Sequence, residues 1–473
     1  MKGRTNAGGS SVQIPLDAPT ALTALAGNAK VSLTWTDPKD KYATPEGEQA
    51  QDPQQLVSKW AYTKIVRKVG SAPTGPYDGV TVVSSEVRNA YQTKAFVDTG
   101  VENGTVYHYA AFAYNDSDVV SEGAFIIAEP KAITVYGAEW NGTDTTKLTR
   151  IGKSESFPEP VPAVANGDGS SPFDGVMPWA GMIESEDPNA GTVVAIPKFW
   201  YRWTELNPGL RLEISDGEQE GFYVSPAHSD RGDGAGERDV VYVGKYHCGP
   251  SYKSLTNQRP RGQETLASCR TKITALGTGV YQWDWAMLWT LRMLYLVEYA
   301  NWDCQTAIGR GCSPSNTVSN TGATDAMLFH TGTDAQNRST YGNCKYRGIE
   351  GLWSGYMNWV EGAFVDAEEN LFIAINPAMF SDVSKGANLG AGARGYPSKF
   401  TIKNALGNQW LIPTEANGSV STYIPDYWNT YVNSIFRVGG GYEQGLPYGL
   451  FYSYAQQESA ISGSIVSRLM VLP

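Results

Sequence analysis

The chain has 473 residues, which is enough for two or three domains with cores of their own. Hydrophobic residues make up 41% and charged residues 18%, a balance typical of globular rather than disordered proteins. The net charge of −11 offers no basic field to attract phosphates, and this argues against nucleic acids and anionic membranes as partners.

The chain begins with "MKGRTNAGGSSVQIPLDAP", which lacks the apolar stretch of a signal peptide. We expect residues 1–14 to form a flexible leader. The most apolar run of the chain, Trp283 to Val297, is interrupted by Asp284 and Arg292 and is too short to span a bilayer. The sequence therefore predicts no membrane insertion.

Alternating residues mark the first domain as a β-sandwich. In "AKVSLTWTD", Val31, Leu33 and Trp35 fall on one face of a half-buried strand. The turn "ENGT" precedes a second alternating run, "VYHYAAFAYN", and is a strong hairpin signal. Short strands at regular spacing predict a sandwich over residues 15–134. The polar insert "KDKYATPEGEQAQDPQQLVSK" is expected to be a loop between strands.

Two stretches of this domain, "DAPTALTALAGNAKVSLTWTD" and "DTGVENGTVYHYAAFAYN", resemble a fibronectin type III domain. Trp35 matches the buried tryptophan of the second strand of that family, and Gly104 to Tyr107 match its tyrosine-corner stretch. The resemblance covers roughly residues 15 to 130. It implies a spacer module, to which we assign no chemistry.

Residues 135–473 have a different character, rich in Gly, Trp and Tyr with short strand-like runs. One helix is predicted in "WDWAMLWTLRMLYLVEYANW", with Asp284 as its N-cap. Apolar residues recur on every face of this helix, so we expect it to be buried. The segment 135–473 is predicted to be one large α+β domain, which makes the whole chain mainly β with an α+β part.

The segment "HSDRGDGAGERD" gathers carboxylates around three glycines. Oxygen ligands on such a loop could bind Ca²⁺, but their spacing departs from the EF-hand pattern. We favour a solvated acidic loop, and we expect no metal or cofactor. The carboxylates concerned are Asp230, Asp233, Glu237 and Asp239.

The chain has five cysteines and no CxxC pair, which argues against a structural zinc site. Cys304 and Cys312 could close a short disulfide loop outside a cell, although free thiols are the favoured interpretation. The remaining cysteines are Cys248, Cys269 and Cys344.

No catalytic motif is recognisable. The chain lacks a GxSxG elbow, a Walker loop and a GxGxxG that follows a strand. Carboxylates are plentiful, so composition alone leaves a glycosidase pair open. We expect a protein that is not an enzyme.

The stretch "GIEGLWSGYMNWVEGAF" and the C-terminal tail together resemble the C-type-lectin-like fold in its formylglycine-generating-enzyme branch. The tail departs from the oxidising members of that branch, because it lacks their cysteine pair after the double glycine. It also lacks the calcium-site motifs of sugar-binding lectins. The resemblance therefore implies the fold without the copper-dependent oxidase activity. The matching residues are Gly351-Leu352-Trp353, Trp359, Arg437 with Gly439-Gly440, and Ser467-Arg468-Leu469.

The part of that branch used only for binding comprises variable proteins of diversity-generating retroelements, including phage tropism determinants. With a fibronectin type III module in front, the chain resembles a phage tail or tail-fibre protein. The resemblance implies a receptor-binding protein of the virion, made in the host cytoplasm and extracellular after release. Its expected partners are a host bacterial surface receptor, protein or glycan, and other phage tail proteins. A homotrimer is expected, since several weak sites together gain avidity.

The alternatives are a structural tail component that binds no ligand and a surface-glycan hydrolase. The resemblance places the binding residues in the C-terminal stretch. Retroelement mutagenesis of adenines turns asparagine codons into codons for residues such as Tyr, Ser, Gly, Ala, Leu and Pro, which marks candidate positions. These are Gly441, Tyr442, Leu446, Pro447, Tyr448, Tyr452, Tyr454 and Ala455, with Tyr423, Tyr427 and Trp428 at the rim.

Glycines of the stretch "GGGYEQGLPYGLFYSY" are expected to turn the chain tightly, among them Gly439, Gly440, Gly445 and Gly449. The runs "GLFY" and "SRLMVL" are expected to be buried strands that fix the segment between them. A competing interpretation is an aromatic edge of the core that binds no ligand.

Overall fold

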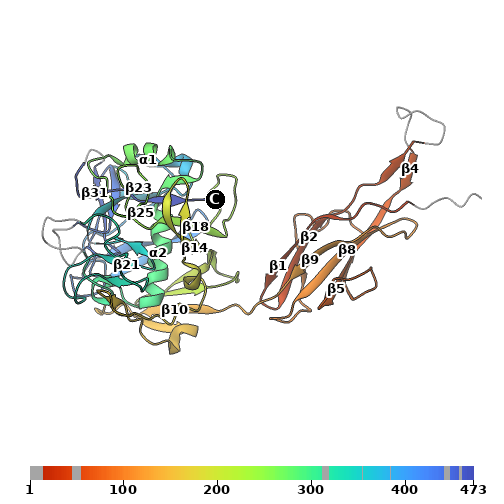
Figure 1. Cartoon of the computed structure of the whole chain (residues 1–473), viewed down its shortest axis with the longest axis horizontal. Helices are drawn as coiled ribbons and strands as arrows, with labels where there is room; N and C mark the ends of the chain where they lie inside the picture. The colour runs from red at the N-terminus through yellow and green to blue at the C-terminus, as the bar shows by residue number, and fades with distance from the viewer. Residues whose placement is uncertain are drawn as a thin grey trace, which may run out of the picture. The chain divides into compact units, whose positions relative to one another are not determined.

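A computed structural model gives the fold of the chain (Figure 1). The protein is mainly β, with 40% of its residues in strands and 9% in helices, as expected. The chain divides into two compact units between Ile133 and Thr134, next to the boundary expected from the sequence. The structure describes residues 14–44, 55–311, 319–353, 355–383, 385–441, 448–457 and 461–473.

The N-terminal unit contains a three-stranded and a four-stranded antiparallel sheet. The first has the order β1 (Thr20–Gly27), β2 (Lys30–Thr36), β7 (Phe96–Asp98). The second has the order β6 (Val80–Ser85), β5 (Trp60–Val69), β8 (Tyr107–Asn115), β9 (Ala124–Ala128).

The core of this unit follows the predicted alternation. Val31, Leu33 and Trp35 of β2 are buried in one cluster with Ile65 of β5 and Tyr109 of β8. Alternate side chains of a strand point to opposite faces, so the residues between them on β2 stay only half-buried. The two sheets thus bury their inner faces together.

The polar insert of this unit contains a short hairpin where the sequence predicted only a loop. β3 (Lys41–Ala43) pairs with β4 (Gln55–Ser58) in an antiparallel ladder. Backbone pairing gives even a polar segment partners for its N–H and C=O groups, and hydrophobic patterning does not report such pairing. Residues 45–54 lie outside the described part of the chain.

The C-terminal unit is built around a sheet of seven strands. Its order is β25 (Ala387–Ala391), β24 (Asn370–Ile373), β23 (Met357–Val365), β29 (Ser434–Val438), β30 (Ser453–Gln457) and β28 (Trp428–Asn429), with β31 (Ile465–Val466) paired to β23.

Further sheets of five, five, four and two strands complete this unit. The first has the order β11 (Thr149–Gly152), β10 (Val135–Trp140), β16 (Leu210–Ser215), β15 (Trp200–Glu205), β17 (Tyr223–Val224). The second has the order β13 (Glu184–Asp187), β14 (Gly191–Pro197), β18 (Val240–Gly244), β32 (Leu469–Val471), β19 (Val280–Gln282). The smaller ones are β12 (Ala163–Val164), β20 (Gly332–Thr333), β21 (Cys344–Tyr346), β22 (Ile349–Glu350), and the pair β26 (Lys399–Ala405), β27 (Asn408–Glu415).

The predicted buried helix is confirmed as α2 (Trp285–Tyr299), which passes through the middle of the C-terminal unit (Figure 1). The Asp284 carboxylate accepts a hydrogen bond from the backbone N–H of Met287 at 2.8 Å, as an N-cap does. All 15 residues of α2 are buried, and such burial explains its apolar residues on every face. Two shorter helices are α1 (Leu266–Thr274) and α3 (Cys304–Ala307).

The end of the chain is held inside the unit. β32 lies between β18 and β19, which confirms the buried strand predicted from "SRLMVL". Arg468, fully buried, donates to the carbonyl oxygens of Gly244 at 2.6 Å and Glu350 at 2.5 Å. The run "GLFY" is buried throughout, as predicted, but it is not a strand, because β30 begins only after it.

Among the residues that the structure describes, no helix is both long and apolar enough to cross a membrane.

Candidate functional site

Four tyrosines of the C-terminal unit form a continuous series of ring contacts, which we call the tyrosine cluster. The ring centroids of Tyr448 and Tyr452 lie 4.6 Å apart, and those of Tyr452 and Tyr454 lie 6.1 Å apart. Tyr431 extends the series, with its ring centroid 5.8 Å from that of Tyr454. Tyr454 lies on β30, and Tyr431 lies between β28 and β29. The pairing of β30 with β28 and β29 brings them together.

The members of the tyrosine cluster differ in exposure. Tyr431 exposes 44% of its surface, Tyr448 and Tyr454 are half-buried, and Tyr452 retains 2%. Burial raises the pKa of Tyr448, Tyr452 and Tyr454 above that of a free phenol. The cluster therefore presents three rings to solvent, with Tyr452 enclosed between two of them.

Two arginines lie against the cluster. The guanidinium carbon of Arg437 is 4.6 Å from the ring centroid of Tyr454, and that of Arg394 is 5.4 Å from the ring centroid of Tyr431. Both are within the range of cation–π attraction. Arg394 also forms an ion pair with Glu369 at 2.6 Å. In the described part of the chain, no hydrogen bond or ion pair engages the side chain of Arg437, and its Nε atom is buried.

A double glycine allows the backbone beside the cluster to turn tightly. Gly439 and Gly440 adopt φ angles of 81° and 68°, in the left-handed region that glycine tolerates without strain. A Cβ atom on Gly440 would lie 2.1 Å from the Cβ of Tyr448. Gly440 is thus required both for its conformation and for the close approach of Tyr448, as the predicted tight turn implied.

Two buried charges hold the segment that carries the cluster. Arg292 of α2 donates to the carbonyl oxygens of Leu450 at 3.0 Å and Tyr452 at 3.1 Å. The carboxylate of Asp426 accepts from the backbone N–H groups of Gly449 at 2.5 Å and Phe451 at 2.8 Å. Burial raises the pKa of Asp426 to about 7 and lowers that of Arg292 to about 9. The central helix and Asp426 thereby fix the backbone on which three of the tyrosines stand.

Burial corrects four of the positions predicted to contact a ligand. Trp428 packs its ring against those of Trp285 and Phe436, at centroid distances of 5.9 and 5.8 Å. Ala455 pairs with Phe436 in the ladder and is completely enclosed. Side chains that point inward from a packed sheet cannot reach a ligand at the surface. The four enclosed positions are Gly441, Tyr452, Ala455 and Trp428.

The remaining predicted positions fall into two groups. Tyr427 is half-buried and makes an edge contact with Tyr396, at a centroid distance of 5.2 Å. Tyr423 is half-buried and packs edge-on against Trp140, at 6.2 Å, with no ring contact to the cluster. Three predicted positions lie outside the described residues, namely Tyr442, Leu446 and Pro447, as does Gly445 of the predicted turns.

Sequence reasoning missed three residues of this site: Tyr431, Arg394 and Arg437. Tyr431 closes the run "TYIPDYWNTY", whose other aromatic residues were assigned to the rim, so a signal for it existed. Arg437 was noted only as part of a fold motif. Arg394 stands in a glycine-rich loop, where the sequence gives no sign that it lies near Tyr431.

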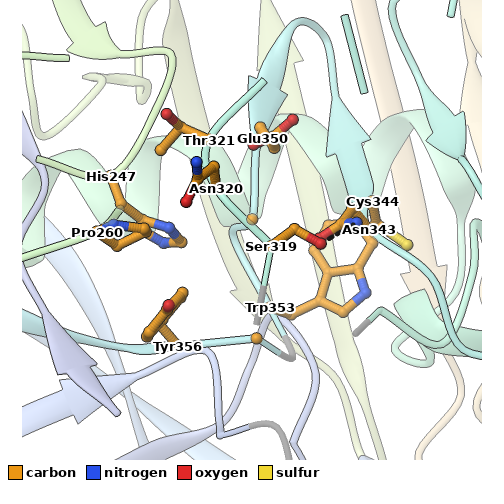
Figure 2. Close-up of a pocket in the computed structure, with 12 residues that line it drawn as sticks. His247, Pro260, Ser319, Asn320, Thr321, Asn343, Cys344, Glu350, Trp353 and Tyr356 are labelled. Carbon is orange, nitrogen blue, oxygen red and sulfur yellow. Dashed lines mark hydrogen bonds between the residues drawn. The ribbon is translucent and has the colours of Figure 1, made fainter. Parts of the chain in front are cut away.

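A second feature is a small cavity beside His247 and Tyr356 (Figure 2). The Nε2 atom of His247 is buried there without a hydrogen-bond partner, and burial lowers the pKa of this histidine. The cavity volume of about 20 Å³ suits one water molecule and is too small for a sugar ring. Glu350 at its edge is satisfied by Thr324, whose N–H and hydroxyl donate at 2.8 and 2.7 Å. This cavity is no candidate for ligand binding.

The acidic loop satisfies its carboxylates with cations of the chain itself. Asp233 pairs with Arg238 at 2.6 Å, and Asp239 pairs with Lys198 at 2.6 Å. Glu237 lies 3.7 Å from Lys198, and Asp230 accepts from the N–H of Gly232 at 2.8 Å. In the described ranges, no group of three or more His, Cys, Asp or Glu side chains is placed to hold a metal ion.

Four cysteines are buried, namely Cys248, Cys269, Cys304 and Cys344, and the first three carry free thiols. Burial raises the pKa of Cys248 to about 12 and that of Cys269 to about 11, so these thiols stay protonated and unreactive near neutral pH. The Sγ atom of Cys304 accepts from the N–H of Leu450 at 3.1 Å. Cys312, the partner of Cys304 in the less favoured disulfide interpretation, lies outside the described residues.

Comparison of the chain with models of known protein families finds no match, and comparison with curated proteins finds none either.

Proposed function

We propose that the protein is a receptor-binding protein of a phage tail, which attaches to a ligand on the host cell surface through the tyrosine cluster. The observation that supports this proposal is the tyrosine cluster itself. Its accessible rings stand on a backbone segment that buried side chains hold in place. Tyrosine offers a large contact area at a small cost in side-chain entropy, which favours it in binding surfaces. Because Arg292 and Asp426 hold the backbone of this segment, the rings lose little conformational entropy when they bind a partner.

The proposal includes a fibronectin type III fold for the N-terminal unit. Sheets of three and four strands, with Trp35 enclosed on the second strand, support it. The hydroxyl of Tyr107 also accepts from the N–H of Glu102 at 2.9 Å, five residues upstream, which is the contact of a tyrosine corner. Such a unit is a spacer in our proposal.

For the C-terminal unit we propose the C-type-lectin-like fold. The residues that carry the resemblance support it, because they have structural roles. Trp359 is enclosed and donates from Nε1 to the carbonyl oxygen of Glu264 at 3.0 Å. Arg468 ties the chain end to the core, and Gly439 provides the left-handed turn beside the cluster.

In this proposal the protein binds its receptor without transforming it and assembles as a homotrimer with other tail proteins in the virion. Three weak sites on one particle bind a surface more tightly than one site does. Light scattering of the purified chain at micromolar concentration is expected to give the mass of a trimer.

Binding to intact host cells tests the function. Fluorescently labelled protein is expected to decorate cells of the host, and Tyr431→Ala with Tyr454→Ala is expected to abolish the signal. Absence of cell binding by the unaltered protein would favour a structural tail component. Release of oligosaccharides from purified envelope glycans would identify a hydrolase instead.

A further inference from the structure

Arg437 differs from other enclosed or half-buried arginines of the C-terminal unit. Arg202, for example, pairs with Glu213 at 2.8 Å, and Arg347 pairs with Glu298 at 2.6 Å. Arg292 and Arg468, which lack a carboxylate partner, donate to backbone carbonyl oxygens. Arg437 is half-buried, yet no acceptor in the described part of the chain engages it.

An unpaired guanidinium in this position is costly for the free protein. Burial removes water from its Nε atom, and the residues that the structure describes supply no hydrogen bond in return. Charge-assisted hydrogen bonds from a guanidinium to a carboxylate are commonly bidentate and are stronger than neutral ones. A ligand carboxylate cannot reach the enclosed Nε atom, but it can accept from the two terminal nitrogens of the half-buried Arg437, for which the described part of the chain supplies no acceptor.

The surroundings of Arg437 orient it toward the cluster. Its position on β29 is opposite Tyr454 in the ladder, and the Tyr454 ring supports the guanidinium from one face. Its positive charge lowers the pKa of Tyr448 and Tyr452, against the larger rise that burial causes. Of the two arginines against the rings, Arg394 is paired with Glu369, and Arg437 is the one without a carboxylate partner in the described part of the chain.

We propose that the tyrosine cluster binds a saccharide that carries a carboxylate. The guanidinium of Arg437 donates two hydrogen bonds to that carboxylate, and the accessible rings of Tyr431 and Tyr448 contact the C–H face of the sugar. This inference rests on the proposed function, because it names the chemistry of the ligand for the same surface. Because Arg394 is already paired with Glu369, the charge of Arg437 suits one acidic group on an otherwise neutral ring.

Titration calorimetry with matched sugars tests the inference. The probes are oligogalacturonate and oligoglucuronate, each as the free acid and as the methyl ester, which keeps the ring and removes the charge. The free acid of at least one pair is expected to bind about tenfold or more tightly than its ester, as befits hydrogen bonds to a charged group. Arg437→Gln is expected to abolish this preference, and Arg437→Lys to restore part of it.

Arg259→Gln is the matched control, because Arg259 is exposed and no hydrogen bond or ion pair in the described part of the chain engages it. It is expected to bind like the unaltered protein. Thermal melting verifies that the Arg437 variants remain folded, which we expect because no described residue loses a hydrogen bond when this side chain is changed.

The outcomes separate the two proposals. Equal affinity for acid and ester, or an unchanged preference in Arg437→Gln, would overturn the acidic-sugar inference. Binding to host cells without binding to any of the four probes would also overturn it and leave the receptor-binding function in place. Failure to bind cells would overturn the function itself.

Discussion

Tyr431 and Tyr452 belong to one cluster but differ in exposure, and we therefore expect them to contribute differently to the stability of the fold. Tyr452 retains 2% exposure and Tyr431 retains 44%. We expect Tyr452→Ala to lower the free energy of unfolding by about 3–5 kcal/mol, the usual cost of removing a buried aromatic ring. Tyr431→Ala is expected to change it by about 0.5 kcal/mol or less. Urea denaturation of the two variants measures the difference.

In cell binding, by contrast, the direct effect is expected from the exposed residue of this pair, because it is the one that can contact a ligand. Tyr431→Ala is expected to weaken it by about 2 kcal/mol, as the loss of an aromatic anchor does. Tyr77→Ala is a suitable control, because Tyr77 is 81% exposed in the other unit and is expected to alter neither property. An unfolded Tyr431→Ala would show that this ring supports the core and is not a ligand contact.

At this scale the sequence predicted a tyrosine-rich site but not which residues face outward. The codon rule selects residue types and contains no information on which face of a strand a side chain occupies. The alternation within β30 would have separated two of the positions, since Tyr454 is half-buried and its neighbour Ala455 is enclosed. Trp428 fills the space beside Trp285 of α2, and that contact depends on packing between segments far apart in the sequence.

Helix α2 supports the site through Arg292, a charge within a wholly buried helix. Its guanidinium donates to Leu450, Tyr452 and the hydroxyl of Ser453, at 3.0, 3.1 and 2.9 Å. Arg292→Met keeps the length of the side chain but leaves these acceptors unsatisfied. We expect a loss of about 3–5 kcal/mol in the free energy of unfolding, as for other broken buried charge contacts. The exposed Arg259, changed to Met, is the control. Equal stability of the Arg292→Met variant would show that water replaces the guanidinium.

The contact of Asp426 with the cluster segment is expected to depend on pH. Burial raises the pKa of Asp426 from 3.8 to about 7. Between these values the folded protein keeps a proton that the unfolded chain has lost. The resulting stabilisation is fully present below pH about 4 and is lost as the pH rises through about 7. Glu361, whose pKa burial also raises to about 7, acts in the same direction.

His228 opposes this trend, because burial lowers its pKa to about 3 and stability therefore falls as the pH drops below about 6.5. Comparison with Asp426→Asn removes these shared contributions. The difference in melting temperature, that of the variant minus that of the unaltered protein, is expected to increase as the pH rises from about 4.5 to about 7.5. Parallel melting curves across this range would show that Asp426 is ionised throughout.

Helices and strands with a strong local sequence pattern could be predicted, and those with a weak pattern could not. α2 was predicted because Asp284 caps a long apolar run. α1 was missed although it has an N-cap too, with the Thr265 hydroxyl accepting from the N–H of Ser268 at 3.2 Å. Its apolar contacts are few, with Leu266, Cys269 and Ile273 buried among polar residues, so the helical spacing is weak. Short hairpins such as β3–β4 leave no hydrophobic pattern at all.

The two units have separate cores, and each hydrophobic cluster draws its residues from one side of the boundary. The division near residue 134 was readable from the change in composition. The contacts of the C-terminal unit were not, since many of them join residues more than a hundred positions apart, as in the bond from Arg231 to the carbonyl oxygen of Ile375 at 3.0 Å, across 144 positions. Such pairings depend on topology, which local patterns do not encode.

Separate cores predict that a chain starting at Thr134 folds alone and binds as the full chain does. Every described residue of the tyrosine cluster, with Arg292 and Asp426 beneath it, belongs to this unit. We expect the shortened chain to keep its melting temperature within about 2 °C and its affinity for a soluble ligand within about twofold, since independent sites add without coupling. A chain starting at Asn141 is the control. It lacks β10, which lies between β11 and β16, and the exposed edge of β16 is expected to leave it poorly folded. Loss of folding in the Thr134 chain would contradict the independence of the two cores.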